Sequence, residues 1–128
     1  MHANETLIRQ AYAAFTRGDV PGFLALCTPD ITFVVPGDGL LGGSHTMEQF
    51  FEKLGPAMQA VAGSFREEIV SLLAGADSCA VWASQRAERD GKTHQWNAVH
   101  WWRIREGRLA EFHEFVDEPA AFEKAWHR

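Results

Sequence analysis

Two side chains near the end of the sequence, His100 and Glu114, have the types and spacing needed for acid–base chemistry. Strand-like alternation along residues 93–105 puts His100 on a face that is otherwise apolar, and alternation along residues 108–116 puts Glu114 between apolar neighbours. Desolvation raises the pKa of such a carboxyl group unless a donor pairs with it. Because the two segments are hairpin neighbours, we expect His100 to be the partner acid or orienting group and Glu114 the general base. The alternative is that Glu114 is a solvated residue on an exposed face.

Aromatic side chains are the second unusual feature of the sequence. Five Trp and nine Phe accompany a single Tyr, and three of the Trp fall within residues 96–102. Side chains of this size form the core of a small domain, and they also line pockets for apolar ligands. For Trp96 and Trp102 the sequence favours neither place over the other.

Other motifs with chemical potential are incomplete. Residues 37–44 have the glycine and serine spacing of a phosphate-binding loop, but Gly43 stands where the lysine belongs, so we expect a flexible loop at a pocket rim. Residues 113–117 lack the final histidine of the zinc motif His-Glu-x-x-His and lie in a predicted strand rather than a helix. We therefore expect no metal and no cofactor. Cys27 and Cys79 form no CxxC pair and are expected to be small core residues.

Length and charge narrow the functional classes. The chain has 128 residues, so we expect one domain over residues 1–128. Twelve Lys and Arg against seventeen Asp and Glu give a net charge of −5, which opposes binding to nucleic acid or to an anionic membrane surface. No segment approaches the ~18 apolar residues of a membrane span, and the first residues do not read as a signal peptide. With only two cysteines, a cytoplasmic location is expected.

Helical periodicity dominates the first half of the chain and strand periodicity the second. From residue 64 onward the apolar period changes to two, and Asp90-Gly91 and Glu106-Gly107 are hairpin signals. Helices followed by hairpin-linked strands indicate an α+β domain with an antiparallel sheet. The expected elements are helices at 4–17 (with Asn4 as N-cap) and 19–27, a turn at 28–30, a strand at 31–36, a glycine-rich loop, a helix from 46, strands from 64, at 79–88, 93–105 and 108–116, and a helix from 119.

Five short motifs stand in order along nearly the whole chain: residues 14–19, 28–33, 42–43, 102–111 and 115–117. In this order they resemble the nuclear transport factor 2-like superfamily, which includes the ketosteroid isomerases and the SnoaL-like polyketide cyclases. The resemblance implies a cone-like, curved sheet wrapped around N-terminal helices, a cystatin-like half-barrel with an apolar pocket open at one end. It also implies a homodimer through the outer sheet face, where Val99 and Trp101 are expected.

The chain departs from the catalytic patterns of that superfamily. The carboxylate base of the ketosteroid isomerases aligns with Val35, and their tyrosine aligns near Ala11, one residue before Tyr12, so steroid isomerisation by that mechanism is not expected. The His-x-Asp pair of the SnoaL-like cyclases aligns with Phe112 and Glu114. The histidine is lost, but a carboxylate able to act as a base is kept.

The resemblance therefore implies a protein that binds a small hydrophobic molecule in an apolar pocket, without a cofactor. An enzyme of this type would be an isomerase, cyclase, dehydratase or epoxide hydrolase, and Arg86, Glu114 and Asp117 are candidates for the arginine-bridged carboxylates of the last class. The alternative is a non-catalytic ligand-binding module or a dimeric protein-association module. Tyr12 or Arg86 is the candidate donor to an oxyanion. The expected pocket residues are Tyr12, Phe33, Phe51, Trp82, Arg86, Trp96, Trp102 and Phe112.

Overall fold

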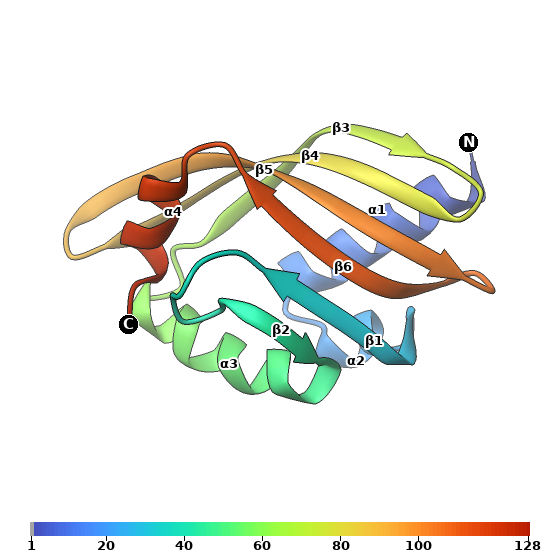
Figure 1. Ribbon diagram of the computed structural model, residues 1–128, viewed down its shortest axis with the longest axis horizontal. Coiled ribbons are helices and arrows are strands. Elements are labelled where there is room, and N and C mark those ends of the chain that lie inside the picture. Colours follow the sequence, from blue (N-terminus) through green and yellow to red (C-terminus); the bar gives the residue numbers. More distant parts are fainter. Residues whose placement is uncertain (1) are drawn as a thin grey trace.

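The computed structural model describes residues 2–128, which form four helices and six strands (Figure 1). None of the helices in this range is long and apolar enough to cross a membrane. In chain order the elements are α1 (Ala3–Thr16), α2 (Val20–Leu24), β1 (Cys27–Val35), β2 (Gly43–Thr46), α3 (Met47–Ala60), β3 (Arg66–Ala74), β4 (Ser78–Arg89), β5 (Lys92–Arg105), β6 (Arg108–Val116) and α4 (Pro119–Trp126).

Helix α1 begins one position before the predicted cap. His2 is the N-cap, and its Nδ1 accepts a hydrogen bond from the Asn4 backbone N–H at 3.0 Å. The Asn4 side chain is buried and donates to the carbonyl oxygens of Gly75 and Ala76, at 2.8 and 3.0 Å. The prediction of Asn4 as the cap is therefore wrong, because this side chain ties α1 to the turn between β3 and β4. Gly18, with φ of +72°, ends the helix as predicted.

One curved sheet of six strands, in the order β2-β1-β6-β5-β4-β3, organises the fold. Strands β3 to β6 form an antiparallel meander, and both predicted hairpin turns adopt positive φ, 55° and 77° at Asp90-Gly91 and 50° and 74° at Glu106-Gly107. The sheet is antiparallel as predicted except at one pairing, where β1 and β6 run parallel. Helix α3 carries the chain from the β1–β2 pair toward the far edge of the sheet, and the meander then returns to β1.

Two local predictions differ from the structure. Helix α2 ends at Leu24, and the predicted turn at residues 28–30 lies inside β1, where the pairing with β6 changes register between Cys27 and Thr32. A bulge of this kind accommodates Pro29, which has no N–H to donate to a neighbouring strand. Strand β2 lies in the segment predicted to be only a glycine-rich loop, and it pairs with the end of β1.

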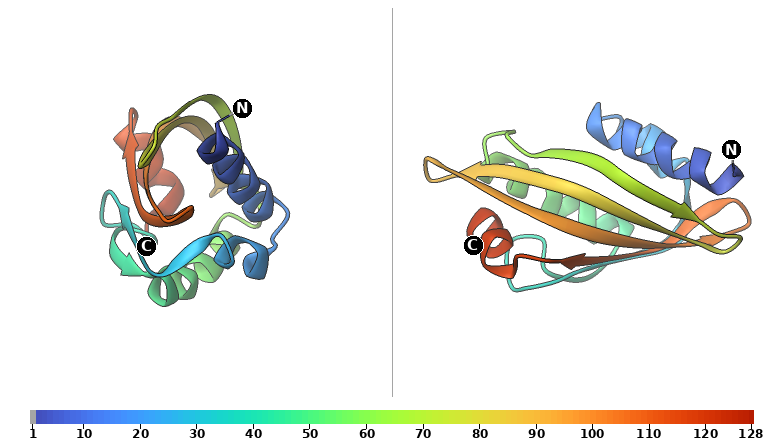
Figure 2. Two further views of the ribbon diagram at one scale, coloured as in Figure 1. Left: turned by 90° about the vertical axis from the view of Figure 1, so that its right-hand side faces the viewer. Right: turned by 90° about the horizontal axis from the view of Figure 1, so that it is seen from above.

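The curvature of the sheet creates an interior. In the left view of Figure 2 the strands trace an open arc, and α1 lies across the open side. Helix α1 contacts β3 and β4, α3 contacts β1 and β2, and α4 contacts β4 and β5. Burial alternates residue by residue along β4 and β5, so each strand has an inner and an outer face. This arrangement confirms the predicted α+β half-barrel with a curved, unclosed sheet.

Candidate functional site

A cavity lies between the concave face of the sheet and the helices. Its volume is about 80 Å³, smaller than the roughly 300–1,000 Å³ usual for small-molecule sites. Helices and strands both contribute aromatic wall residues, which are Tyr12, Phe15, Phe23, Phe33, Phe50, Phe65, Trp102, Phe112, Phe122 and Trp126. The polar side chains of the wall are Tyr12, Glu67, Gln85, His100 and Glu114. The cavity is therefore apolar except for one connected polar group of residues.

His100 and Glu114 form the centre of this polar group. They are directly opposite each other in the β5–β6 register, and their Nε2 and Oε2 atoms are 2.6 Å apart. Their side chains are only 4% and 9% exposed. The predicted pairing of the two residues is thus confirmed, and the alternative of a solvated Glu114 on an exposed face is excluded. The sheet produces the pairing because residues directly opposite each other on adjacent strands point to the same face.

Tyr12 extends the pair into a chain. From the inner side of α1 its Oη lies 2.5 Å from His100 Nδ1 and accepts a hydrogen bond from Trp102 Nε1 at 3.0 Å. An indole N–H can only donate, so the Tyr12 hydroxyl hydrogen is left to donate to Nδ1 of the neutral imidazole. The remaining ring hydrogen is then on Nε2 and points at Glu114. Trp102 Nε1, Tyr12 Oη, both ring nitrogens of His100 and Glu114 Oε2 all have a hydrogen-bond partner in this arrangement.

A second carboxylate, Glu67, lies near His100 without a hydrogen bond to its ring. Gln85 Nε2 lies 3.3 Å from His100 Nε2 and donates a short hydrogen bond to Glu67. Trp96 Nε1 donates to Gln85 Oε1 at 2.7 Å, which fixes the orientation of the amide. Trp96 itself is buried against Phe122. Two carboxylates, Glu67 and Glu114, therefore flank one histidine on the cavity wall.

Burial and mutual charge shift the titration of this group. Burial, and next the negative charge of Glu67, raise the pKa of Tyr12 well above its ordinary 10.0, so its hydroxyl stays protonated. Burial also raises the pKa of Glu67, against the opposing effects of His100 and Gln85. For His100, burial acts to lower the pKa, but the hydrogen bond to Glu114 and the charges of Glu114 and Glu67 together raise it above 6.5.

The predicted site residues divide into two groups. Those that line the cavity are Tyr12, Phe33, His100, Trp102, Phe112 and Glu114. Phe51 lies behind the wall, edge-to-face with Phe23 and Phe50, and Trp96 is part of the core that holds Gln85.

The placement of Trp82 and Arg86 in the pocket is wrong. Both are exposed on the outer face, because β4 turns Gln85 and the small residues beside it inward. The arginine-bridged pair of carboxylates is not assembled either. Asp117 is exposed and accepts hydrogen bonds from the Asn97 backbone and side chain at 2.8 and 3.0 Å.

Glu67 and Gln85 were not among the predicted site residues, although the sequence contains a signal for each. Glu67 has the same parity as Phe65 and Ile69 in a strand-like segment, and Gln85 is the polar member of an alternating set of small and apolar residues in β4. A polar residue at an inward position is the informative observation.

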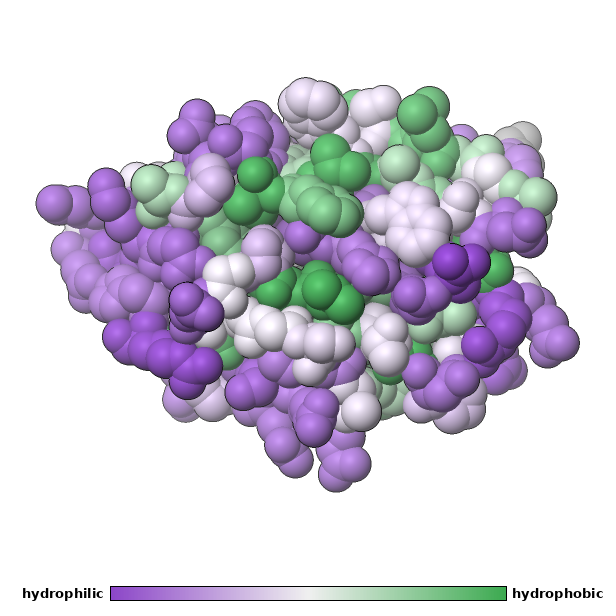
Figure 3. Space-filling model, viewed as in Figure 1, coloured by the Kyte–Doolittle hydropathy of each residue, from purple (hydrophilic) through white to green (hydrophobic). Residues whose placement is uncertain are grey.

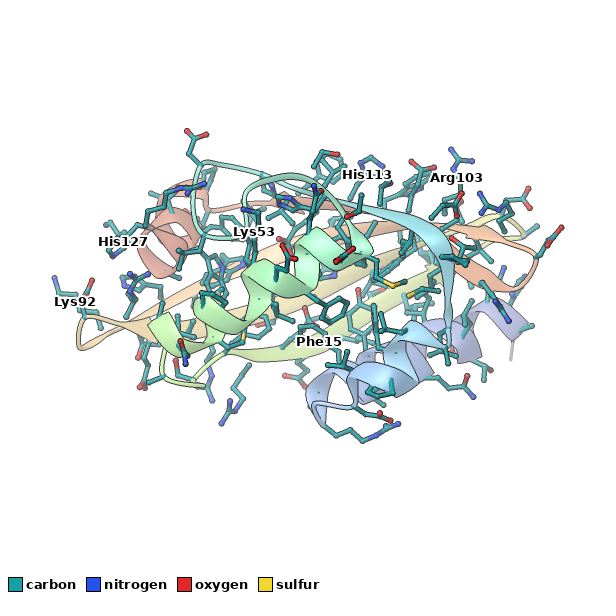
Figure 4. All side chains as sticks on the ribbon, turned by 90° about the horizontal axis from the view of Figure 1, so that it is seen from below. Phe15, Lys53, Lys92, Arg103, His113 and His127 are labelled. Atoms are coloured by element: carbon teal, nitrogen blue, oxygen red, sulfur yellow. The ribbon has the colours of Figure 1, made fainter. Side chains whose placement is uncertain are left out.

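The mouth of the cavity opens toward the end of α1. A groove outside it shares with the cavity the side chains of Phe15, Phe23, Leu54, Met58, Phe65 and Glu67. Figure 4 shows Phe15 in the gap between α3 and the α1–α2 pair. A ligand entering from the groove therefore passes Phe15 and Glu67 before it reaches His100. In residues 2–128 no group of three or more His, Cys, Asp or Glu side chains is arranged to hold a metal ion.

Comparison with known proteins agrees with this architecture. An uncharacterized protein of Mycobacterium tuberculosis strain H37Rv, Rv0034, is 29% identical over 126 residues, which cover 97% of this chain and 96% of the relative. The structure of Bal32a, from a soil-derived mobile gene cassette, superposes with a TM-score of 0.90 at 24% identity and covers 98% of this chain and 97% of that one. A nuclear transport factor 2-like protein of unknown function from Burkholderia pseudomallei K96243 gives a TM-score of 0.85 at 26% identity and 98% coverage of each chain.

The family model for the SnoaL-like domain matches residues 8–112. That range contains α1 from residue 8 onward, α2, α3, five of the strands and the first part of β6, and it includes His100 of the site but not Glu114. The chain belongs to the SnoaL-like domain family, with the nuclear transport factor 2-like fold.

Proposed function

We propose that this protein binds a small, largely apolar molecule in the cavity and moves a proton on it by means of Glu114 and His100. The observation that carries the proposal is a hydrogen-bonded chain, Tyr12–His100–Glu114, on the wall of an otherwise apolar cavity. Burying ionisable side chains costs free energy, and such groups with perturbed pKa values in a cavity are typical of catalytic sites.

Glu114 has one oxygen to spare for a ligand. Its Oε2 is hydrogen-bonded to His100, and Oε1 has no hydrogen-bond partner among residues 2–128. In the proposed reaction Oε1 takes a proton from a carbon atom next to a carbonyl group, or from a water molecule that opens an epoxide. His100 holds the carboxylate in place and, in its protonated form, supplies the proton that the product needs. Tyr12 fixes the imidazole ring.

This chemistry requires no cofactor and includes isomerisation, aldol-type cyclisation, dehydration and epoxide opening. Arg86 and Asp117 have no part in it, since both side chains are exposed away from the cavity. The oxyanion that forms on a carbonyl oxygen would be stabilised by protonated His100, whose pKa is raised by its two carboxylate neighbours.

The test begins with ligand discovery by thermal shift, using steroids, polyketide esters, terpene epoxides and small aromatic ketones. A ligand at ~100 times its dissociation constant stabilises the folded chain by about 2.7 kcal/mol. Ketones that bind are then incubated in D₂O, and exchange of their α-hydrogens is followed by mass spectrometry. We expect the wild type to catalyse this exchange and Glu114→Gln to lose it by roughly 10²–10⁴-fold while still binding.

Glu111→Gln is the matched control, because Glu111 is a carboxylate on the same strand that pairs with Arg103 outside the cavity. Exchange that survives in Glu114→Gln would refute the assignment of the base. Binding without exchange by the wild type would instead identify a non-catalytic ligand-binding protein.

We also infer that two copies of the chain associate through the outer face of the sheet. Trp82, Val99 and Phe115 form a row across β4, β5 and β6, since each is the register partner of the next, and they are 50%, 39% and 61% exposed. Figure 3 shows apolar side chains gathered over the strands, with hydrophilic surface around them. A face of this kind can pack against the same face of a second copy in an isologous dimer. This packing removes the apolar row from water.

We further propose a cytoplasmic location. Cys27 and Cys79 are both free and buried, and unpaired thiols of this kind suit a reducing compartment.

A further inference from the structure

We propose that the cavity selects ligands that carry a protonated amine, and that Glu67 is the residue that determines this specificity. The inference rests on the proposed function, because it names the charge of the molecule that the same cavity binds. It goes beyond that function in assigning a role to a carboxylate that the proton transfer does not use.

The charges on the cavity wall are not balanced. Its titratable side chains are Tyr12, Glu67, His100 and Glu114, and within residues 2–128 no Lys or Arg lines it. Tyr12 is uncharged. His100 is bonded to Glu114 at 2.6 Å, so any positive charge on its ring is offset by that carboxylate. Two carboxylates therefore share at most one positive charge, and Glu67 is the one with no direct bond to His100.

The position of Glu67 makes it accessible to a ligand. One of its oxygens, Oε2, accepts a hydrogen bond from Gln85, whose amide is held in place by Trp96. The other, Oε1, has no hydrogen-bond partner among the described residues. Glu67 lines both the cavity and the groove outside it, so a ligand contacts it at the mouth and can remain beside it when bound.

The other charged groups of the groove are already engaged. Arg66 donates from Nη1 to the backbone carbonyl oxygens of Gly63 and Phe65, at 2.9 and 2.8 Å. Asp19 is paired with Arg17 at 3.1 Å. The Arg66 guanidinium keeps its positive charge, but Arg66 lines only the groove, so no cation lies beside Glu67 on the wall of the cavity itself.

These charges favour one ligand class. A ligand ammonium group supplies the counter-charge that Glu67 lacks, and water screens a pair at the edge of an apolar cavity less than it screens a surface pair. Inside the cavity a ligand carboxylate meets two carboxylates and no Lys or Arg side chain, and like charges in a low-dielectric site repel strongly. A neutral ligand of the same shape is neither attracted nor repelled by the carboxylates. We therefore expect affinity to fall in the order amine, alcohol, acid.

The experiment uses matched ligands that differ only in the head group. The probes are 4-phenylbutylamine, 4-phenylbutan-1-ol and 4-phenylbutanoic acid, with the corresponding hexyl series as a second skeleton, and binding to the full chain is measured by calorimetry at neutral pH. We expect the amine to bind at least tenfold more tightly than the acid and severalfold more tightly than the alcohol. Glu67→Gln should remove the preference for the amine and leave the affinity for the alcohol within about twofold, because the glutamine keeps the size of the side chain.

Glu68→Gln is the matched control, since the next residue of β3 is exposed and removes the same charge from the whole protein. A preference that Glu68→Gln lowers as much as Glu67→Gln, or that disappears in high salt, would be surface attraction to an acidic protein and would refute the proposal. So would equal binding of all three head groups, or tightest binding of the acid.

Failure of this inference can be told apart from failure of the proposed function. If the alcohols bind in the cavity but the amines show no preference, ligand binding stands and the charge selectivity is wrong. If no head group binds on either skeleton, both proposals fail together.

Discussion

At the scale of single residues, the hydrogen-bond partners of the neutral His100 ring fix which of its nitrogens carries the hydrogen. Trp102 can only donate, so the Tyr12 hydroxyl is available to the His100 ring, and the other ring nitrogen faces Glu114. Alternation in the sequence predicted that His100 and Glu114 lie on inward faces. It did not predict the link to Tyr12, because nothing local to residue 12 specifies which strand residue its hydroxyl will meet.

The titration of His100 gives a prediction about stability. The hydrogen bond to Glu114 and the nearby carboxylate charges, opposed by burial, raise the folded-state pKa of His100 above 6.5. A raised pKa means that protonation favours the folded chain. The free energy by which protonated His100 stabilises the folded chain is fully present below about pH 6.5. It is lost as the pH rises through the folded-state pKa.

We therefore expect the difference in unfolding free energy between the wild type and His100→Gln to shrink from about pH 5.5 to about pH 8.5. Urea denaturation at a series of pH values measures it. His94→Gln, on the same strand but half-exposed, is the control and should show no such trend. A difference that grows with pH would mean that burial lowers the pKa of His100 by more than the carboxylates raise it.

At the scale of elements, an irregularity in β3 decides which of its residues reach the cavity. Strand β3 changes register against β4 between Ile69 and Ser71. Before this bulge Glu67 has the inward parity, and after it Leu72 and Ala74 are the more buried positions. The strict alternation of the sequence predicts inward residues only up to the bulge, since the extra residue reverses the parity beyond it.

Helix α4 lies beyond residues 8–112, the part of the chain matched by the family model, yet it supplies Phe122 and Trp126 to the cavity wall. The carbonyl oxygen of Trp126 accepts a hydrogen bond from the Leu40 N–H at 2.7 Å, and that of Ala125 accepts one from Arg89 at 3.0 Å. These bonds hold the helix against the end of the half-barrel. The last element of the chain is thus part of the site rather than an appendage.

Removing the large side chain of α4 should therefore weaken the fold. Trp126 is 2% exposed, so we expect Trp126→Ala to lower the unfolding free energy by about 3–5 kcal/mol, and Trp126→Phe by less. Urea denaturation measures both. Lys124→Ala, an exposed position on the same helix, should change stability by no more than about 0.5 kcal/mol. Equal effects of Trp126→Ala and Lys124→Ala would show that α4 does not seal the cavity.

At the scale of the whole molecule, the two faces of the sheet carry different kinds of surface. The concave face holds the polar chain and the cavity, and the convex face presents Trp82, Val99 and Phe115. Cross-strand register aligns these three residues into one row, although they are far apart in the sequence. Only the folded sheet therefore reveals the row as a single apolar surface.

If this face joins two copies, a charge at its centre should separate them. We expect the wild type to be a dimer by analytical ultracentrifugation and Val99→Glu to be a monomer, because a buried, unpaired carboxylate in the interface costs several kcal/mol. Val20→Glu is the matched control, since Val20 is also 39% exposed but lies on α2, away from the sheet. A monomeric wild type, or equal dissociation by the two variants, would contradict the proposed interface.

The sequence by itself determined the order of the elements apart from β2, the two hairpins, the α+β class and the inward positions of His100 and Glu114, because apolar periodicity and turn chemistry are local properties. The half-barrel was implied by the resemblance to the nuclear transport factor 2-like superfamily. The tertiary structure alone decided the parallel pairing of β1 with β6, the outward placement of Trp82 and Arg86, and the meeting of Tyr12, Gln85 and Glu67 at one histidine. These features depend on register, bulges and contacts between segments distant in the chain. No local pattern encodes them, since the free energy that selects them comes from packing the whole sheet against its helices.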